Sequence, residues 1–82
     1  MDFKHTIKPY ILKNFLFTDD ESAVADSTSL IRGGIVDSTG ILELIEFLES
    51  TYAIKVSPEE MIPANFDSID TISAFLAHKV SG

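Results

Sequence analysis

The sequence predicts an all-α fold: a small four-helix bundle in which three longer helices and one short helix surround a single core. Apolar residues recur at helical spacing in three segments, near residues 2–17, 38–51 and 68–80. No segment shows the sustained alternation of a strand, and the brief alternation at residues 52–56 has no second run to pair with. A chain of 82 residues makes one core, so we expect a single domain over residues 1–82.

The first predicted helix runs from about Asp2 to Phe17. Pro9 fits this helix if Thr6 caps it and the proline falls in the first turn; otherwise the helix is kinked. The predicted buried stripe consists of Phe3, Ile7, Tyr10, Ile11, Asn14 and Phe15.

A long loop is predicted between the first two helices, over residues 18–36. Residues 18–22 suit a short extra turn, residues 23–25 a fragment of helix, and Gly33-Gly34 break regular structure. Because Leu30, Ile35 and Val36 can anchor the segment to the core, we expect the loop to be ordered.

The second predicted helix, from about Ser38 to Thr51, begins behind Asp37, a natural N-cap residue. Its outer face carries Glu43 and Glu46, with Glu49 beside the buried stripe and Leu42 at its border. The stripe itself comprises Ile41, Leu44, Ile45, Leu48 and Tyr52.

Two further helices complete the prediction. Ser57-Pro58-Glu59-Glu60 is a capping box that opens a short helix, which Pro63 limits to about Ile62. We expect Met61, Ile62 and Phe66 to face inward. Asp67 or Ser68 caps the last helix. Its stripe is Ile69, Ile72, Phe75, Leu76 and Val80.

Composition excludes several classes of function. The chain has no cysteine, so it lacks a disulfide framework, a thiolate zinc site and a cysteine nucleophile. From residue 19 onward, twelve acids face three cations, which disfavours nucleic acid and anionic membranes and favours basic protein partners. The alternative is that the acidic surface only keeps the protein soluble. No apolar run suggests a membrane span or a signal peptide, and we expect a cytoplasmic monomer.

The segment Asp37-Ser38-Thr39-Gly40 is the candidate functional site. A serine at a helix start has a hydroxyl that can project from the surface, and the unpaired N–H groups of the first turn favour an attached phosphate. Gly40 is unfavourable in a helix, which is easier to understand if a partner passes close to the backbone there. The alternative is that Asp-Ser is an ordinary capping sequence.

No other group of residues suggests catalysis or a metal site. His5 and His78 stand far apart in the sequence and lack neighbouring acids and nucleophiles, so we expect ordinary surface histidines. Asp19-Asp20-Glu21 lacks the ligand spacing of a calcium loop. We therefore expect neither an enzyme nor a metalloprotein.

Along almost its whole length the chain resembles the acyl carrier proteins. The matching features are the N-terminal helix, the loop ending in Leu30-Ile31-Arg32-Gly33-Gly34-Ile35-Val36, the Asp37-Ser38 pair, the acidic helix after it, the short helix after Ser57, and Phe66-Asp67-Ser68-Ile69 opening the last helix.

The resemblance implies that Ser38 carries 4′-phosphopantetheine through a phosphodiester, with Asp37 as part of the attachment motif. The thiol of that arm would hold an acyl group as a thioester and bring it to successive enzymes. Partners implied are a phosphopantetheinyl transferase, an acyl- or aminoacyl-activating ligase, and acyl-processing enzymes with basic docking patches. Residue by residue, the docking surface would be Asp37, Leu42, Glu43, Glu46 and Glu49. For the glutamates, the alternative is a merely solvated helix face.

The Asp-Ser-x-Gly form departs from carriers of fatty-acid synthesis, which place a larger apolar residue and then an acid after the serine. Thr39 and Gly40 stand there instead, as in D-alanyl and stand-alone aminoacyl carriers. We therefore predict an acyl carrier of a specialised pathway. The alternatives are an aminoacyl or peptidyl carrier and, from another class, a helical protein–protein interaction domain without a prosthetic group.

Overall fold

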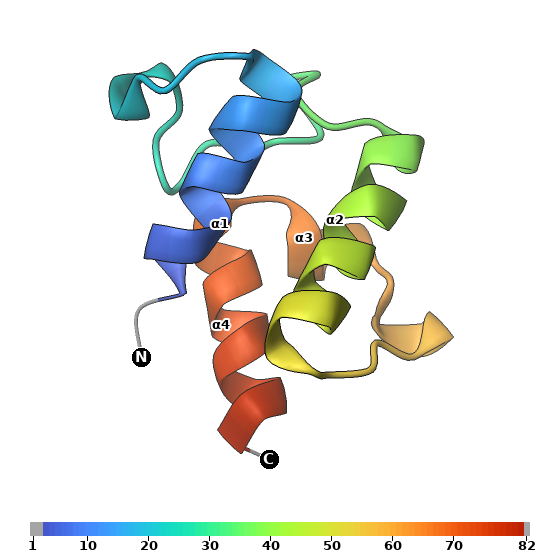
Figure 1. Cartoon of the computed structure of the whole chain (residues 1–82). Coiled ribbons are helices and arrows are strands. Elements are labelled where there is room, and N and C mark those ends of the chain that lie inside the picture. Colours follow the sequence, from blue (N-terminus) through green and yellow to red (C-terminus); the bar gives the residue numbers. More distant parts are fainter. Residues whose placement is uncertain (1–2, 82) are drawn as a thin grey trace.

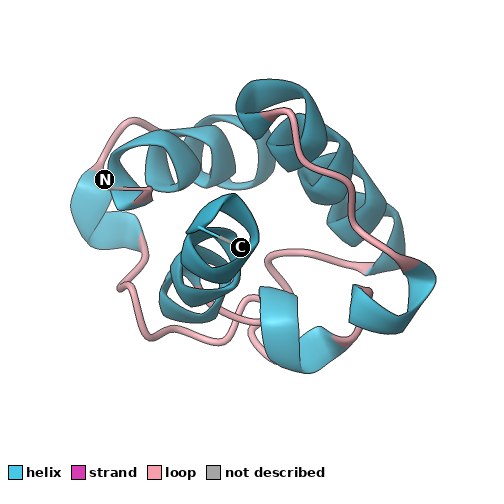
Figure 2. Ribbon diagram, turned by 90° about the horizontal axis from the view of Figure 1, so that it is seen from below, coloured by secondary structure: helices cyan, strands magenta, loops and turns pink. Residues whose placement is uncertain are grey.

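The computed structural model describes residues 3–81, and every regular element in that part of the chain is helical. The longer helices are α1 (Lys4–Ile11), α2 (Ser38–Tyr52) and α4 (Ile69–Ser81), and α3 (Pro63–Phe66) is short. Figure 1 shows the C-terminal end of α4 at the bottom and the α1–α2 loop across the top. Viewed from below, α4 lies in the centre with the other segments around it (Figure 2). The all-α bundle is confirmed.

α1 and α2 are joined through aromatic side chains. The ring of Tyr10 stacks on that of Phe47, with 4.0 Å between centroids and 9° between planes. Phe15 meets the Tyr10 ring edge-on at 5.9 Å. The fully or nearly fully buried core beneath them comprises Phe3, Ile7, Ile11, Leu12, Val24, Leu30, Val36, Leu44, Ile45, Leu48, Val56, Phe66, Ile69, Ile72, Phe75 and Leu76.

The first helix differs from its prediction in two ways. It begins at Lys4, close to the predicted onset at about Asp2, but Phe3 rather than Thr6 stands at the cap position, so Pro9 lies inside the helix. It then widens into one π-helical turn, η1 (Leu12–Leu16). The extra residue in that turn changes the register, so Leu12 is buried while Asn14 faces solvent and its side-chain amide donates to the Tyr10 carbonyl at 2.9 Å. The prediction of Asn14 on the buried stripe was wrong.

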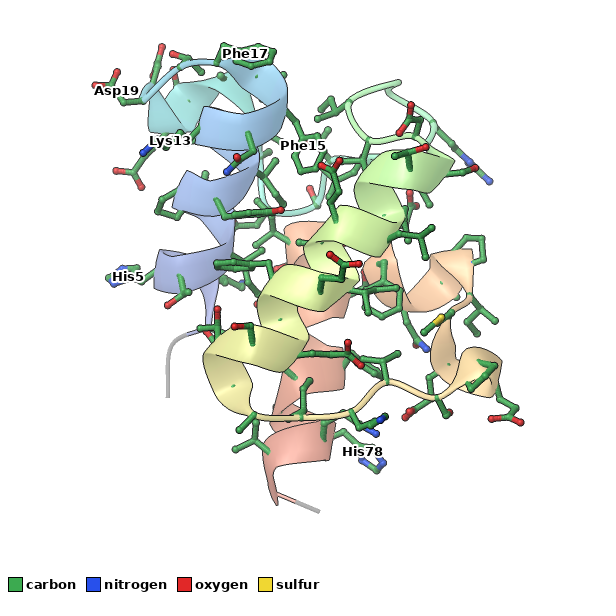
Figure 3. All side chains as sticks on the ribbon, turned by 45° about the vertical axis from the view of Figure 1, so that its right-hand side comes forward. His5, Lys13, Phe15, Phe17, Asp19 and His78 are labelled. Atoms are coloured by element: carbon green, nitrogen blue, oxygen red, sulfur yellow. The ribbon has the colours of Figure 1, made fainter. Side chains whose placement is uncertain are left out.

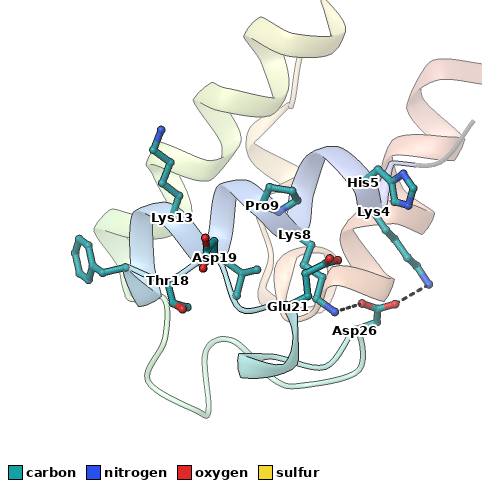
Figure 4. Close-up of a pocket in the computed structure, with 11 residues that line it drawn as sticks. Lys4, His5, Lys8, Pro9, Lys13, Thr18, Asp19, Glu21 and Asp26 are labelled. Atoms are coloured by element: carbon teal, nitrogen blue, oxygen red, sulfur yellow. Dashed lines mark hydrogen bonds and ion pairs between the residues drawn. The ribbon is translucent and has the colours of Figure 1, made fainter.

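Ion pairs hold α1 against the loop and the last helix. Lys4 contacts Asp70 at 2.7 Å. Lys4 and Lys8 also contact Asp26, at 3.5 Å and 3.3 Å (Figure 4). The hydrogen bond from Lys8 is the main cause that lowers the pKa of Asp26. In the same loop, the predicted extra turn is the 3₁₀ turn η2 (Glu21–Ala23).

The segment before the last helix contains two short helices where one was predicted. The capping box opens only the 3₁₀ turn η3 (Pro58–Glu60), and Pro63 then starts α3 as its first residue. Because a residue before proline is held extended, Ile62 (φ −112°, ψ 150°) separates the two helices. Ile62 and Met61 are exposed, so their predicted inward orientation was wrong, whereas Phe66 is buried as predicted.

α4 begins where the sequence indicated. The Ser68 hydroxyl accepts a hydrogen bond from Thr71 N–H at 3.1 Å, so Ser68 is the cap. The predicted stripe is buried apart from Val80, which is exposed. Near the end of α4, Lys79 contacts Glu60 at 2.9 Å and ties the helix to η3.

Candidate functional site

Ser38 is the first residue of α2, and its side chain is exposed. Asp37 before it has an extended backbone (φ −98°, ψ −172°) and caps the helix: its Oδ1 accepts a hydrogen bond from Gly40 N–H at 2.7 Å. The Asp37 carbonyl accepts the first intrahelical bond, from Ile41 N–H at 2.9 Å. The predicted cap is therefore confirmed, and it places the Ser38 hydroxyl at the surface rather than in the core.

The start of α2 is a favourable place for a negative charge. The first N–H groups of a helix have no acceptor one turn earlier, and here the Asp37 carboxylate takes only that of Gly40. The N–H groups of Ser38 and Thr39 remain directed out of the helix start, where the dipole also favours an anion. A phosphodiester on Ser38 would lie at this positive end.

Gly40 has a structural role that the sequence did not reveal. It is buried, and a Cβ added there would lie 2.8 Å from Phe15 Cε1 and 2.9 Å from Val36 Cγ1. What passes close to the Gly40 backbone is thus the protein's own Phe15 ring. The glycine is therefore explained by packing inside the protein, and not by the expected close approach of a partner.

The loop that leads to Ser38 is fixed by Asp67, at the start of α4. Asp67 Oδ1 accepts hydrogen bonds from the Ser29 hydroxyl at 2.7 Å and from Ile31 N–H at 3.3 Å, and its carbonyl accepts from Leu30 N–H. The Leu30 carbonyl in turn accepts from the N–H groups of Ile35 at 2.9 Å and Val36 at 3.1 Å.

Sequence reasoning placed Asp67 only among the possible caps. Because Ser68 takes that role, the Asp67 carboxylate is available for the loop. The sequence contains one local signal for this role: Asp67 stands beside a second residue that can cap the helix, so its carboxylate can be free for another contact. The partner of Asp67 is identified only by the fold, because Ser29 lies 38 positions away in the sequence.

An apolar groove of about 560 Å³ adjoins Ser38. One wall is the first turns of α2, and the opposite wall is the segment that joins η3 to α3. Asp37 and Ser38 are the polar side chains at its edge. The remaining lining residues are Ile31, Gly34, Val36, Ile41, Leu42, Ile45, Met61, Ile62 and Pro63. The outward-facing Met61 and Ile62 therefore belong to this groove rather than to the core.

The predicted docking residues on α2 have different surroundings. Leu42 is 56% exposed, and Glu43 and Glu46 are exposed. Glu49 is half-buried, and its Oε2 accepts a hydrogen bond from Val56 N–H at 2.9 Å. Leu42, Glu43 and Glu46 are thus exposed on the helix that Ser38 begins, whereas Glu49 bonds the chain segment that follows α2.

Other candidate features are absent from the described residues. Within residues 3–81, no group of three or more His, Asp or Glu side chains could hold a metal ion. His5 lies on α1 and His78 on α4, and both are exposed (Figure 3). In the same range, no helix is both long and apolar enough to cross a membrane.

Comparison with known proteins identifies the family of the chain. No protein-family model matches the chain. It is 34% identical over 61 residues to a protein named probable acyl carrier protein PigG, from Serratia sp. (strain ATCC 39006). The match covers 73% of this chain and 70% of that protein. With this similarity, a fully helical bundle and a serine at the start of an acidic helix, the chain belongs to the acyl carrier protein family.

Proposed function

We propose that this protein carries acyl groups as thioesters on 4′-phosphopantetheine attached to Ser38, and presents them to the enzymes of a specialised pathway. The observation that supports it most directly is the exposed position of Ser38 as the first residue of α2, in a member of the acyl carrier protein family. The protein itself has no catalytic role in this proposal.

The residues present suit such an attachment. The Ser38 hydroxyl oxygen attacks the β-phosphate of coenzyme A, a P–O bond forms, and adenosine 3′,5′-bisphosphate leaves; a base of the transferase takes the hydroxyl proton. The start of α2 then stabilises the anionic phosphodiester. The attached group supplies a thiol, which a chain without cysteine otherwise lacks.

The groove beside Ser38 supports an apolar cargo. Eight of its eleven lining residues are aliphatic or proline side chains, and the polar ones lie at its edge. A hydrocarbon chain placed there would be removed from water at a gain of roughly 0.8 kcal/mol per buried CH₂. A charged aminoacyl group would gain little from these walls, so they favour an acyl carrier. The Asp-Ser-x-Gly form favours the second candidate, an aminoacyl or peptidyl carrier.

Partner enzymes are proposed to recognise the outer face of α2. Glu43 and Glu46 can meet basic patches, and Leu42 offers an apolar contact next to the groove. Exposed charges of this type mainly set the rate and orientation of association. Glu49 contributes less to docking in this proposal because its carboxylate already bonds Val56. The partners are a transferase, an activating ligase and acyl-processing enzymes, and the protein acts as a cytoplasmic monomer.

Intact mass tests the attachment. The purified protein is incubated with coenzyme A and a broad-specificity phosphopantetheinyl transferase. We expect the mass of one phosphopantetheine to be added to the wild type and to Ser50→Ala, an exposed serine at the other end of α2, but not to Ser38→Ala. No gain in folded wild-type protein would favour the interaction domain without a prosthetic group.

A loading assay then separates the two cargo classes. The modified protein is offered to acyl-activating and to amino acid-activating ligases with their substrates, and the thioester is detected by mass. Charging by acyl ligases alone supports the first candidate. Charging by an amino acid-activating ligase alone would replace it with the aminoacyl carrier.

A further inference from the structure

Phe17 is the most exposed large apolar side chain in the described part of the protein, with 85% of its surface accessible. It ends the π-helical turn in a left-handed conformation (φ 54°, ψ 42°), which glycine or asparagine adopts more readily than an aromatic residue. An aromatic side chain in this conformation that buries so little adds little stability to the fold. Strained backbone conformations of this kind occur preferentially at functional sites, which makes Phe17 a candidate contact residue.

Hydrogen bonds before and after Phe17 fix the backbone that directs its side chain outward. The N–H groups of Phe17 and Thr18 both bond to the Leu12 carbonyl, the second at 3.1 Å. The Thr18 hydroxyl then accepts from Asp20 N–H at 3.1 Å. The outward position is therefore part of the fold, and Figure 3 shows Phe17 at the upper end of the molecule, pointing away from it.

Lys13, four residues before Phe17, adds a positive charge to the same turn. Lys4, Lys8 and Lys79 all form ion pairs with carboxylates. Lys13 is exposed and has no such pair within residues 3–81, and in Figure 4 it points away from the Lys4–Asp26–Lys8 cluster. An aromatic side chain with a free cation on the same turn is complementary to an apolar recess with a carboxylate at its rim.

The end of η1, which carries Lys13 and leads to Phe17, packs against the start of α2. Two residues before Phe17, the Phe15 ring packs against Gly40, which is in the first turn of α2. The end of η1 and the start of α2 therefore adjoin, and Figure 1 shows both at the upper end of the bundle. An enzyme that covers about 800 Å² of surface around Ser38 reaches about 16 Å in each direction. We expect a contact area of this size to extend onto the end of η1, because η1 packs against the first turn of α2.

We propose that Phe17 and Lys13 form a second contact for the phosphopantetheinyl transferase, separate from the acidic face of α2. Among the partners of a carrier, the transferase must place its own catalytic centre on the Ser38 oxygen, so its surface must cover this end of the bundle. Enzymes that act on the cargo can work at a distance through the arm. The inference rests on the proposed attachment to Ser38.

The test measures transferase kinetics with the broad-specificity enzyme and coenzyme A, with the carrier concentration varied and modification followed by intact mass. The variant is Phe17→Asn, because asparagine suits the left-handed conformation and removes the ring without breaking the fold. Val80→Asn is the matched control, since Val80 is also an exposed apolar residue but lies near the C-terminal end of α4. Circular dichroism confirms that both variants remain folded.

We expect Phe17→Asn to lower kcat/KM by about tenfold, mainly through KM, as for a buried aromatic anchor at an interface. Phe17→Leu should retain much of the activity, and Val80→Asn all of it. Lys13→Glu should slow modification at low salt, and the difference should fade at high salt.

If the wild type is modified and Phe17→Asn matches it within about twofold, the second contact does not exist. A wild type that gains no mass would instead overturn the attachment to Ser38, so the two failures are distinguishable.

Discussion

The variant Gly40→Ala has two opposite effects on the free energy of unfolding: it raises helix propensity at the start of α2, and it overpacks the space beside Phe15 and Val36. Alanine is favoured over glycine by up to about 1 kcal/mol in a helix, and by less in the first turn. The added methyl group would stand 2.8 Å from Phe15 Cε1 and 2.9 Å from Val36 Cγ1, well inside an ordinary carbon–carbon contact. Overpacking of this kind costs about 1–3 kcal/mol. We expect a net loss of about 1 kcal/mol in the free energy of unfolding.

Thermal unfolding followed by circular dichroism measures the result. For a domain of this size, 1 kcal/mol corresponds to a fall in Tm of about 4–8 °C. Thr39→Ala is the matched control, because Thr39 is the preceding residue of α2 but is exposed. Alanine there gains helix propensity without a collision, so its Tm should stay equal or rise slightly.

A double variant identifies the source of the loss. Phe15→Leu removes the ring edge that faces Gly40. We expect Gly40→Ala to cost less in the Phe15→Leu background than in the wild type, which a double-mutant cycle measures as a coupling energy. A Tm that rises with Gly40→Ala, as with Thr39→Ala, would show that the ring moves aside freely and that the internal explanation for this glycine is wrong.

Three further predictions concern the loop, the docking surface and pH. Asp67→Ala should lower the free energy of unfolding by about 2 kcal/mol through two lost hydrogen bonds, and Asp67→Asn, which keeps an acceptor oxygen, by less; urea unfolding measures both. Glu43→Lys combined with Glu46→Lys should leave Tm largely unchanged yet slow modification at low salt; equal rates would mean that the glutamates are only a solvated face. The pKa of Glu60 is lowered from 4.5 to about 2 by the backbone N–H of Ser57 in its capping box and by Lys79. Its contribution to stability is therefore present above about pH 4.5 and lost as pH falls toward about 2. Glu60→Gln should show a smaller decrease in Tm than the wild type as pH falls from about 4.5 toward about 2.

The parts of the fold that were predicted correctly are those with local causes. The cap by Asp37 and the spacing of Leu44, Ile45 and Leu48 are visible in the sequence, and together they determine the start and the buried side of α2. The exposure of Leu42 follows from the same spacing. Because Ser38 directly follows the cap, its exposure could also be predicted.

The parts that were missed depend on packing between distant segments or on backbone changes that leave little signal. A π-helical turn contains one extra residue, and no residue type around Asn14 predicts such a turn. Pro63 limits the predicted short helix, but proline is equally suited to the first position of another helix, which is where the structure has it. The role of Asp67 depends on the fold bringing Ser29 beside it. The role of Gly40 likewise depends on the fold bringing the Phe15 ring against it.

The missed contacts explain how a long loop can deliver Ser38 to a fixed position. Ordering each loop residue costs about 1–2 kcal/mol in backbone entropy. An enzyme that uses one hydroxyl group as the nucleophile needs that group placed within a fraction of an ångström. Asp67 fixes the loop at Leu30 and Ile31, and Phe15 fixes the first turn of α2 against η1. Loss of either contact should therefore reduce the rate of modification by more than the folded fraction falls, because the hydroxyl of a still-folded protein would occupy a wider range of positions.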